Sequence, residues 1–348
     1  MTKIKLHKDF IKRYKNFLNS DIFNRQQSLS KSKYWEHHAK LIKSNIENSS
    51  VSLEGLSGNY IPPKKNSLDL YFRTLKYLIK KIIGYEVNSN MSYKNAFNKV
   101  IEEKNIEGKH RLKFENEKII VKNYSECKKN YPFSYDVSDH VLRSYYYLNI
   151  FKSYIDFSKK LNLVEIGGGN GNLMSLAKYH LNVNSILNID LPETLTICIP
   201  FIGSLFPTSK VLMPHEIKKE KIDLDDFNEY DFIFLTPSQI SLVEKDIVDL
   251  SINTASFQEM TMQQIKLYLD FIQIITRNNG YFFCTNSVEK IPVDGNINKS
   301  DLYKIEPNRF FEYPFKDNDL LIYQLCKLTS LVQNDPAYLR LEKIKKTI

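Results

Sequence analysis

Residues 163–173 read LVEIGGGNGNL, and this stretch decides the fold of the chain. An apolar run of strand length is followed by a glycine turn and by the start of a helical pattern, an order typical of the ligand-binding edge of a parallel sheet. Glycine lets the backbone turn tightly and approach a ligand closely. Gly167, Gly169 and Gly171 stand two residues apart, whereas dinucleotide-binding folds use GxGxxG, with unequal spacing. The stretch therefore predicts a cofactor site, and its spacing disfavours a nicotinamide or flavin dinucleotide.

Downstream of this turn, apolar runs of strand length alternate with helical patterns. This alternation predicts an α/β fold with a parallel sheet and crossover helices. The expected strands are 163–166, 186–189, 231–235, 248–253 and 281–285, followed by a pair near 308–314 and 320–326. The expected helices are 172–179, 193–205 and 262–276. Because the last two strands lie too close in sequence for a helix between them, we expect them to form an antiparallel hairpin.

The part of the chain before residue 161 has a different character. Apolar positions at helical spacing predict helices within 5–46, over 68–83 and over 137–160, with a loop at 49–66 and a hairpin formed by 111–114 and 118–121. We therefore divide the chain into a mainly helical extension over 1–160, a sheet domain over 161–330 and a C-terminal tail over 331–348. The extension is expected to close the active site, and a homodimer interface is an alternative use for it.

Composition limits the possible partners. The net charge is +9, but the positive residues fall in short runs typical of a solvated surface, so we expect no nucleic-acid partner. The four cysteines show no CxxC spacing, and no metal site is predicted. Without a signal-like apolar segment or a run long enough to span a membrane, the expected location is cytoplasmic.

Polar residues follow the expected strands at their carboxyl ends, where ligands bind in open α/β sheets. Asp190 ends the second strand, where a carboxylate can accept both hydroxyls of a ribose, although it could instead cap the next helix. Ser238 and Gln239 follow the third strand, and a plain polar loop is one interpretation of them. Asn253 ends the fourth strand and is expected to line the same pocket.

The ExGxGxG form of the turn resembles motif I of S-adenosylmethionine-dependent methyltransferases. Together with DLPET at 190–194 and SFQEM at 256–260, it resembles the sugar O-methyltransferase family of bacteria over roughly residues 35–326. The resemblance implies a class I methyltransferase fold, Rossmann-like with a seven-stranded sheet, and S-adenosyl-L-methionine as the cofactor. In that class, residues after the third strand contact the adenine of the cofactor, so the resemblance makes Ser238 and Gln239 candidates for this contact. The residues expected to bind this cofactor are Glu165, Gly167, Gly168, Gly169, Gly171, Asp190, Leu191, Ser238, Gln239 and Asn253.

The same resemblance implies methylation of a sugar hydroxyl in polysaccharide biosynthesis, for a capsule or lipopolysaccharide, with a sugar, nucleotide sugar or glycan as acceptor. An alcohol must lose its proton to attack a methyl group, so a general base is needed beside it. Glu259 after the fourth strand is the first candidate, and His215 and His140 follow. Each has a structural alternative: Glu259 could cap a helix, His215 could be exposed in a polar connection, and His140 could pack in its aromatic helix.

Other functions stay open at this stage. An NAD-dependent dehydrogenase would need the GxGxxG spacing, which is missing here. A methyltransferase for base amino groups would carry a tetrapeptide such as Asn-Pro-Pro-Tyr after the fourth strand, where this chain has NTAS at 253–256. The sequence leaves another small-molecule acceptor, an RNA ribose acceptor and a catalytically inactive binding subunit as alternatives.

Overall fold

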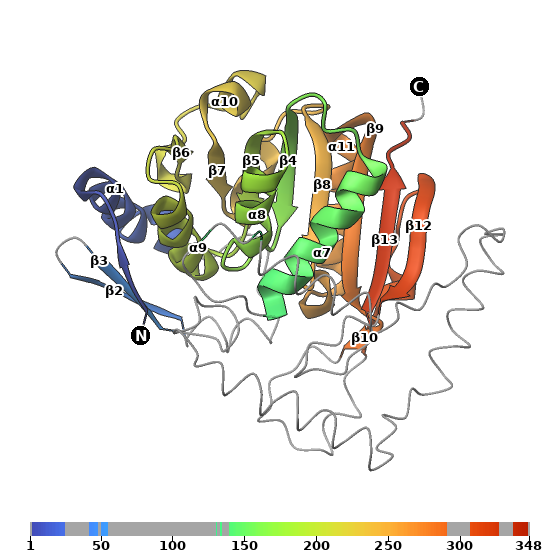
Figure 1. The fold of residues 1–348 in the computed structure, drawn as a ribbon, viewed down its shortest axis with the longest axis horizontal. Helices are drawn as coiled ribbons and strands as arrows, with labels where there is room; N and C mark the ends of the chain where they lie inside the picture. The colour runs from blue at the N-terminus through green and yellow to red at the C-terminus, as the bar shows by residue number, and fades with distance from the viewer. Residues whose placement is uncertain are drawn as a thin grey trace, which may run out of the picture.

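The computed structural model (Figure 1) describes residues 2–24, 42–47, 50–54, 130, 133, 139–290, 307–326 and 337–346. Its centre is an eight-stranded sheet. From one edge to the other the strands are β6 (Val211–Leu212), β7 (Phe232–Leu235), β5 (Val183–Ile189), β4 (Leu161–Ile166), β8 (Val248–Thr254), β9 (Thr276–Ser287), β13 (Ala337–Lys343) and β12 (Asp319–Cys326). The predicted parallel sheet is confirmed, with β6 as an additional short edge strand.

All neighbouring strands from β6 to β9 are parallel, and β13 runs antiparallel to both β9 and β12. Within this sheet the chain first forms the central strand β4. It then adds β5, β6 and β7 on one side of β4 and crosses to β8 on the other side. Strand order therefore reverses next to β4. In open α/β sheets such a reversal leaves a crevice at the carboxyl ends of the strands, where ligands bind.

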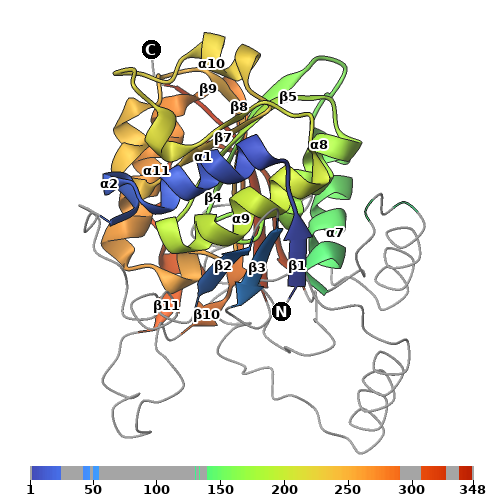
Figure 2. The same ribbon diagram turned by 90° about the vertical axis from the view of Figure 1, so that its left-hand side faces the viewer.

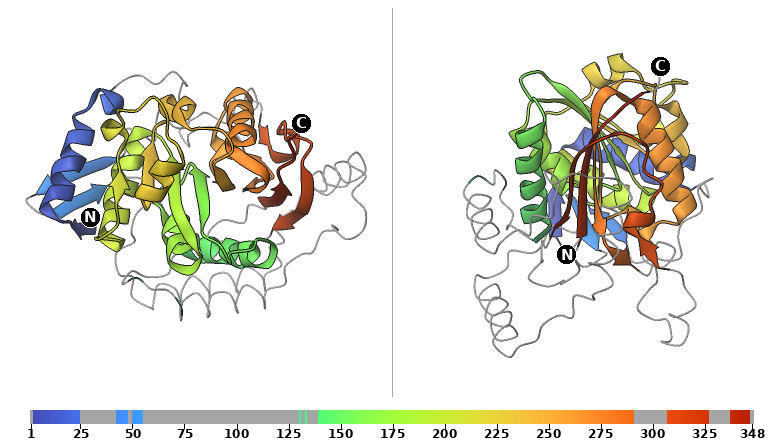
Figure 3. Two further views of the ribbon diagram at one scale, coloured as in Figure 1. Left: turned by 90° about the horizontal axis from the view of Figure 1, so that it is seen from above. Right: turned by 90° about the vertical axis from the view of Figure 1, so that its right-hand side faces the viewer.

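Helices cover both faces of the sheet (Figure 3). One face carries α7 (Asp139–Tyr154), α8 (Asn172–His180) and α9 (Pro192–Leu205), and the other carries α10 (Leu224–Glu229) and α11 (Met262–Ile275). Alternation along β4 sends Leu163 into the first core and Val164 into the second. Because both faces are covered, the second halves of β4 and β5, residues 163–166 and 186–189, are mainly apolar, with Glu165 and Asn188 as exceptions, and the sequence pattern located these halves.

The N-terminal segment packs against the α9 side of the molecule (Figure 2). Helices α1 (Lys8–Leu18) and α2 (Asp21–Asn24) accompany a small antiparallel sheet of order β1-β3-β2, made of β1 (Thr2–Lys5), β3 (Ser50–Glu54) and β2 (Lys43–Glu47). The predicted helical character is confirmed for α1 and α7. It is wrong for 43–46, which form most of β2, and the predicted loop is wrong for 50–54, where Val51 is fully buried in the core.

Close packing holds α1 in place. The Arg13 side chain donates two hydrogen bonds of 2.6 Å to the carboxylate of Glu216, and the Tyr14 hydroxyl donates to the carbonyl of Thr196 at 2.8 Å. A Cβ at Gly203 on α9 would lie 2.4 Å from the Phe10 ring, so glycine is needed where the two helices meet. The predicted helix over 68–83 and the hairpin over 111–121 lie outside the described residues.

The C-terminal part departs from the prediction. Strand β13 lies inside the sheet between β9 and β12, so the expected tail over 331–348 is wrong for 337–343. Only two residues of the expected strand near 308–314 are extended, as β11 (Asn308–Arg309), and they pair with β10 (Glu289–Lys290) outside the main sheet. The partner of β12 in its hairpin is therefore β13. The reason is packing, because Tyr338, Leu339 and Leu341 are fully buried.

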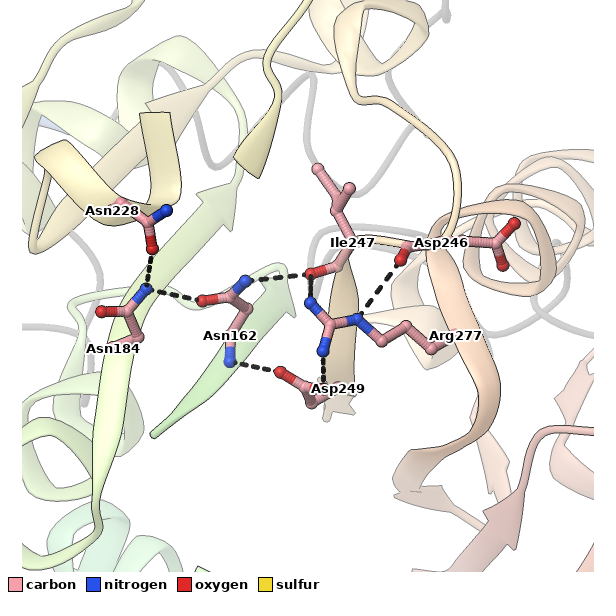
Figure 4. Close-up of polar contacts among 7 residues, drawn as sticks. All are labelled: Asn162, Asn184, Asn228, Asp246, Ile247, Asp249 and Arg277. Atoms are coloured by element: carbon pink, nitrogen blue, oxygen red, sulfur yellow. Dashed lines mark hydrogen bonds and ion pairs between the residues drawn. The ribbon is translucent and has the colours of Figure 1, made fainter. Parts of the chain in front are cut away.

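The amino edge of the sheet is closed by a polar network (Figure 4). The Asn162 side chain donates to the carbonyl of Ile247 at 3.0 Å and accepts from Asn184 at 3.1 Å, while Arg277 pairs with Asp249 at 2.8 Å. A cavity of about 400 Å³ opens beside these residues. It lies at the edge opposite the glycine turn, so it is separate from the predicted cofactor site. No helix in the described ranges combines the length and apolar character needed to cross a membrane.

Candidate cofactor and active site

The glycine turn stands at the carboxyl end of β4 and leads into α8. Gly167, Gly169 and Gly171 all have positive φ, at +72°, +59° and +86°, a region that side chains other than glycine rarely adopt. Added Cβ atoms would meet Ser256 at Gly167, the Asn188 side chain at Gly168 and Cys198 at Gly171. At Gly169 a Cβ would meet nothing within 4 Å. The turn is therefore packed from below, and its open side is at Gly169.

Asp190 lies directly beside this open side. Its carboxylate accepts a hydrogen bond from the backbone N–H of Gly169 at 2.8 Å and another from Leu191 at 2.7 Å. The N-cap of α9 is Leu191, so Asp190 is not the capping residue of that helix. Burial raises the pKa of Asp190, the two backbone hydrogen bonds lower it, and the nearby charge of Glu259 raises it, giving about 7. Burial thus keeps a proton acceptor of unusual basicity next to the turn.

Glu165 lies beneath the turn. Gly171, the N-cap of α8, has no side chain to satisfy the exposed N–H groups of that helix, and Glu165 accepts a hydrogen bond from the backbone N–H of Met174. Its Oε2 atom is buried and has no hydrogen-bond partner within the described ranges. Burial, and then the charge of Asp190, raise the pKa of Glu165 to about 8. The structure therefore places two buried carboxyl groups under one cofactor turn.

Asn253 supports the turn from the neighbouring strand β8. Its amide donates to the carbonyl oxygen of Ile166 at 3.0 Å and to the hydroxyl of Ser256 at 2.5 Å, and it is fully buried. Its oxygen accepts from the amide of Asn286 on β9 at 2.9 Å. The sequence placed Asn253 at this edge, as the structure does. The polar atoms of its side chain bond to Ile166, Ser256 and Asn286.

The residues expected at the adenine end differ from one another. Gln239 is buried, and its side chain bonds to the backbone N–H of Thr236 at 3.1 Å and to the carbonyl of Pro214 at 2.9 Å. These bonds give Gln239 a structural role in the turn after β7. Ser238 is exposed and bonds to the hydroxyl of Thr236 at 2.9 Å. Of the two, Ser238 keeps the exposure that a ligand contact requires.

Glu259 lies on a short helical turn (Phe257–Glu259) that follows β8. Its carboxylate forms an ion pair of 2.7 Å with Lys290, and its side chain is 12% exposed. Thr261 caps α11 by accepting from the backbone N–H of Gln264, so Glu259 is not the cap of that helix. The charge of Glu259 raises the pKa of Asp190, which places it in the electrostatic range of the cofactor turn.

Of the two histidine candidates, His215 lies apart from the turn, and His140 stands at the start of α7. His215 follows β6 at the outer edge of the sheet, three strand spacings of about 4.8 Å from β4. Its ring contacts Phe17 of α1, and burial lowers its pKa. His140 at the start of α7 is 2.5 Å from the Arg143 guanidinium, and burial together with that charge lowers its pKa to about 4. Both environments favour the neutral imidazole. Glu259 is kept as the first candidate because it follows β8 and its charge acts on Asp190 beside the turn.

Sequence reasoning missed three residues of this edge, namely Asn188, Ser256 and Asn286. Asn188 fills the space under Gly168, Ser256 fills the space under Gly167, and Asn286 fixes Asn253. Each is a polar residue in or beside an apolar strand, and each is buried. That signal was available in the sequence, since a polar residue in a buried strand needs an internal partner.

No protein-family model matches the sequence, and no match is found among curated proteins. Several solved structures resemble it at low identity. A Haloferax volcanii complex of a methyltransferase activator with a methyltransferase matches at 12% identity, over 59% of this chain and 91% of that chain, with a TM-score of 0.40. A geranyl diphosphate methyltransferase in complex with S-adenosylmethionine matches at 13% identity, over 59% and 86%, with a TM-score of 0.39.

A third similar structure is phosphoethanolamine N-methyltransferase 2 of Haemonchus contortus with S-adenosyl-L-methionine, at 11% identity and a TM-score of 0.36. It is matched over 57% of this chain and 52% of that chain. At such scores the strand order itself, rather than these likenesses, defines the fold. The sheet is parallel except for β13, which is inserted between β9 and the edge strand β12. This strand order is the class I methyltransferase fold expected from the sequence.

Proposed function

We propose that this protein is an S-adenosylmethionine-dependent O-methyltransferase that acts on a sugar hydroxyl. One observation carries the cofactor assignment. The open side of the turn at Gly169 and the carboxylate of Asp190 are joined by a hydrogen bond of 2.8 Å at the carboxyl edge of β4 and β5. A nucleoside needs both features, a backbone that it can approach closely and an acceptor for its ribose hydroxyls.

The residues present suit this cofactor better than a dinucleotide. The GxGxG spacing and the acids beneath it offer no cradle for a pyrophosphate, whereas a sulfonium cofactor carries positive charge that buried carboxyl groups attract. Glu165, Gly167, Gly169 and Asp190 would hold it, with Gly168, Gly171 and Leu191 shaping the turn. When bound, the cofactor supplies a methyl group activated by its sulfonium.

The acceptor assignment rests on the resemblance in sequence and on the available base. Transfer to a hydroxyl requires the proton to leave, and Glu259 is a carboxylate at the correct edge of the sheet. Lys290 holds it at 2.7 Å and so fixes its orientation. A sugar or nucleotide sugar, used in surface-glycan synthesis, is the acceptor class that we propose. Retention of the protein in the cytoplasm would give it access to nucleotide sugars.

The experiment measures transfer of a labelled methyl group from S-adenosylmethionine to a panel of nucleotide sugars, with RNA as a separate substrate. We expect a labelled sugar product, and we expect Glu259→Gln to lower kcat by about 100-fold or more while cofactor affinity stays unchanged. His215→Gln, at the outer edge, is the matched control and should keep most of the activity. Labelling of RNA, or of no acceptor by a protein that binds the cofactor, would overturn the sugar assignment.

A further inference from the structure

The segment that follows β8 turns back toward the glycine turn. Ala255 has a φ of +55°, although alanine disfavours this region. Its backbone N–H donates to the carbonyl of Thr285 on β9 at 2.8 Å, which holds the bend. A strained residue of this kind persists only where its surroundings fix it, and such residues gather at functional sites. Here the bend directs the next residue, Ser256, at the end of β4.

Two hydrogen bonds converge on one carbonyl oxygen at that point. The oxygen of Ile166, the last residue before the glycines, accepts from the Asn253 amide at 3.0 Å and from the Ser256 hydroxyl at 3.1 Å. Ser256 Oγ also occupies the space beneath Gly167, 2.3 Å from where a Cβ would stand. The position of the first glycine is therefore fixed by residues from β8 rather than by β4 alone.

A second layer of amides fixes the first. The Asn286 amide donates to the oxygen of Asn253 at 2.9 Å, and the Asn286 oxygen accepts from the backbone N–H of Gln258 at 3.1 Å. Gln258 in turn accepts from the backbone N–H of Ser287 at 2.7 Å. Asn253, Gln258 and Asn286 are each at least nine-tenths buried. The network joins the ends of β4, β8 and β9 to the turn that carries Glu259.

We infer that Asn253, Ser256 and Asn286 are positioning residues that hold the glycine turn in its cofactor-binding geometry and tie it to the segment bearing Glu259. The inference rests on the proposed function, because it assigns these residues a role toward the same cofactor. They act through Ile166 and Gly167, without contacting the reacting atoms. A network across three strands keeps the cofactor turn and the base in one fixed relation, as transfer of a methyl group requires.

The test measures the binding of S-adenosylhomocysteine by calorimetry to the full chain and its variants, so it needs no acceptor. We expect Ser256→Ala and Asn286→Ala to weaken binding by about tenfold each, because each removes buried hydrogen bonds that fix the turn. The matched control is Ser251→Ala. Ser251 lies in the middle of β8, is fully buried, and bonds at 2.7 Å to the hydroxyl of Thr276, the first residue of β9, on the side away from the glycine turn. This control should lower the melting temperature and leave the affinity unchanged.

The outcomes separate this inference from the proposed function. If the wild-type chain fails to bind the probe, the proposed cofactor is wrong. If it binds and both Ser256→Ala and Asn286→Ala only lose stability, with the affinity of the wild type, these residues are structural and the inference is overturned. Should Asn286→Ala fail to fold, Ser256→Ala, which deletes a single oxygen atom, decides the question alone. Recovery of affinity in Ser256→Thr, which restores the hydroxyl, would support the positioning role further.

Discussion

Glu165 and Asp190 place two buried carboxyl groups close together, and the free energy of unfolding therefore depends on pH. Burial and the Asp190 charge raise the pKa of Glu165 from 4.5 to about 8, and burial raises that of Asp190 to about 7. In the cofactor-free protein the native state therefore binds more protons than the unfolded state between pH 4 and 8. Stability is fully present at the lower end of this window and is lost as the pH rises through it.

The first prediction follows from this decrease of stability with rising pH. Glu165→Gln removes one titrating group, so the free energy of unfolding should depend less on pH between 5 and 8, with a gain on the order of 3–5 kcal/mol at the alkaline end as an upper bound. Urea denaturation at several pH values measures it. Glu216→Gln is the contrast: burial raises the pKa of Glu216, but the bond from Arg13 lowers it overall, so this variant loses stability at neutral pH. A Glu165→Gln curve parallel to wild type contradicts the account.

Gly169 and Gly171 allow a second prediction on the turn. Gly169→Ala meets no atom within 4 Å and should cost only about 1 kcal/mol, because its φ is +59°. The new methyl group would fill the space that the cofactor needs, so cofactor affinity should fall at least tenfold. Gly171→Ala would meet Cys198 at 3.0 Å and should mainly reduce stability. Calorimetry and thermal melting separate the two effects, and full affinity in Gly169→Ala would show that the cofactor lies elsewhere.

Among the elements, those with uniform environments were predictable and those with mixed environments were not. Strands β4 and β5 are buried on both faces, and their second halves, residues 163–166 and 186–189, are mainly apolar in the sequence. Strand β13 is equally buried, but it carries Arg340 and Glu342, which hid it. The structure pairs these charges with each other at 2.9 Å, and the Arg340 guanidinium lies 4.3 Å from the Phe315 ring. Such compensation depends on distant residues and cannot be found by periodicity.

The same limit applied to the candidate site. The positions of the glycine turn, Asp190 and Asn253 at the carboxyl edge were predictable because they follow strands at fixed positions along the sequence. Ser256 and Asn286 were missed because their partners are distant in sequence. Ser256 is 90 residues from Ile166, and Asn286 is 33 residues from Asn253. Only the strand order brings them together. Gln239 was assigned to a ligand, whereas its bonds to Thr236 and Pro214 are structural.

The third prediction tests β13 as an inner strand. Leu339 is fully buried between the helical layer and the sheet, so Leu339→Ala should cost about 2–5 kcal/mol through lost burial and the cavity left behind. Lys345, beyond the strand, is exposed, and Lys345→Ala should change stability by less than about 0.5 kcal/mol. Chemical denaturation compares the two variants. Equally small losses of stability in the two variants would contradict the position of residues 337–343 as an inner strand of the sheet.

At the scale of the whole molecule, the sheet separates two polar edges. Its amino edge is closed by Asn162, Asn184 and Arg277, whose polar groups bond to one another and to the backbone. Its carboxyl edge carries the strand-order reversal, the glycine turn and the two buried acids. The fold therefore directs a ligand to the carboxyl edge, where a cationic ligand would lower the raised pKa values of the two acids and be bound by their charged forms.

The most direct test of this account is a calorimetric titration of the purified chain with S-adenosylmethionine and, separately, with NAD. We predict binding of S-adenosylmethionine at micromolar concentration, no binding of NAD, and a loss of at least tenfold in affinity in Asp190→Ala. Asp249→Asn, at the amino edge, is the matched control and should bind as the wild type does. Binding of NAD alone, or of neither compound, would contradict the assignment of this protein as a methyltransferase.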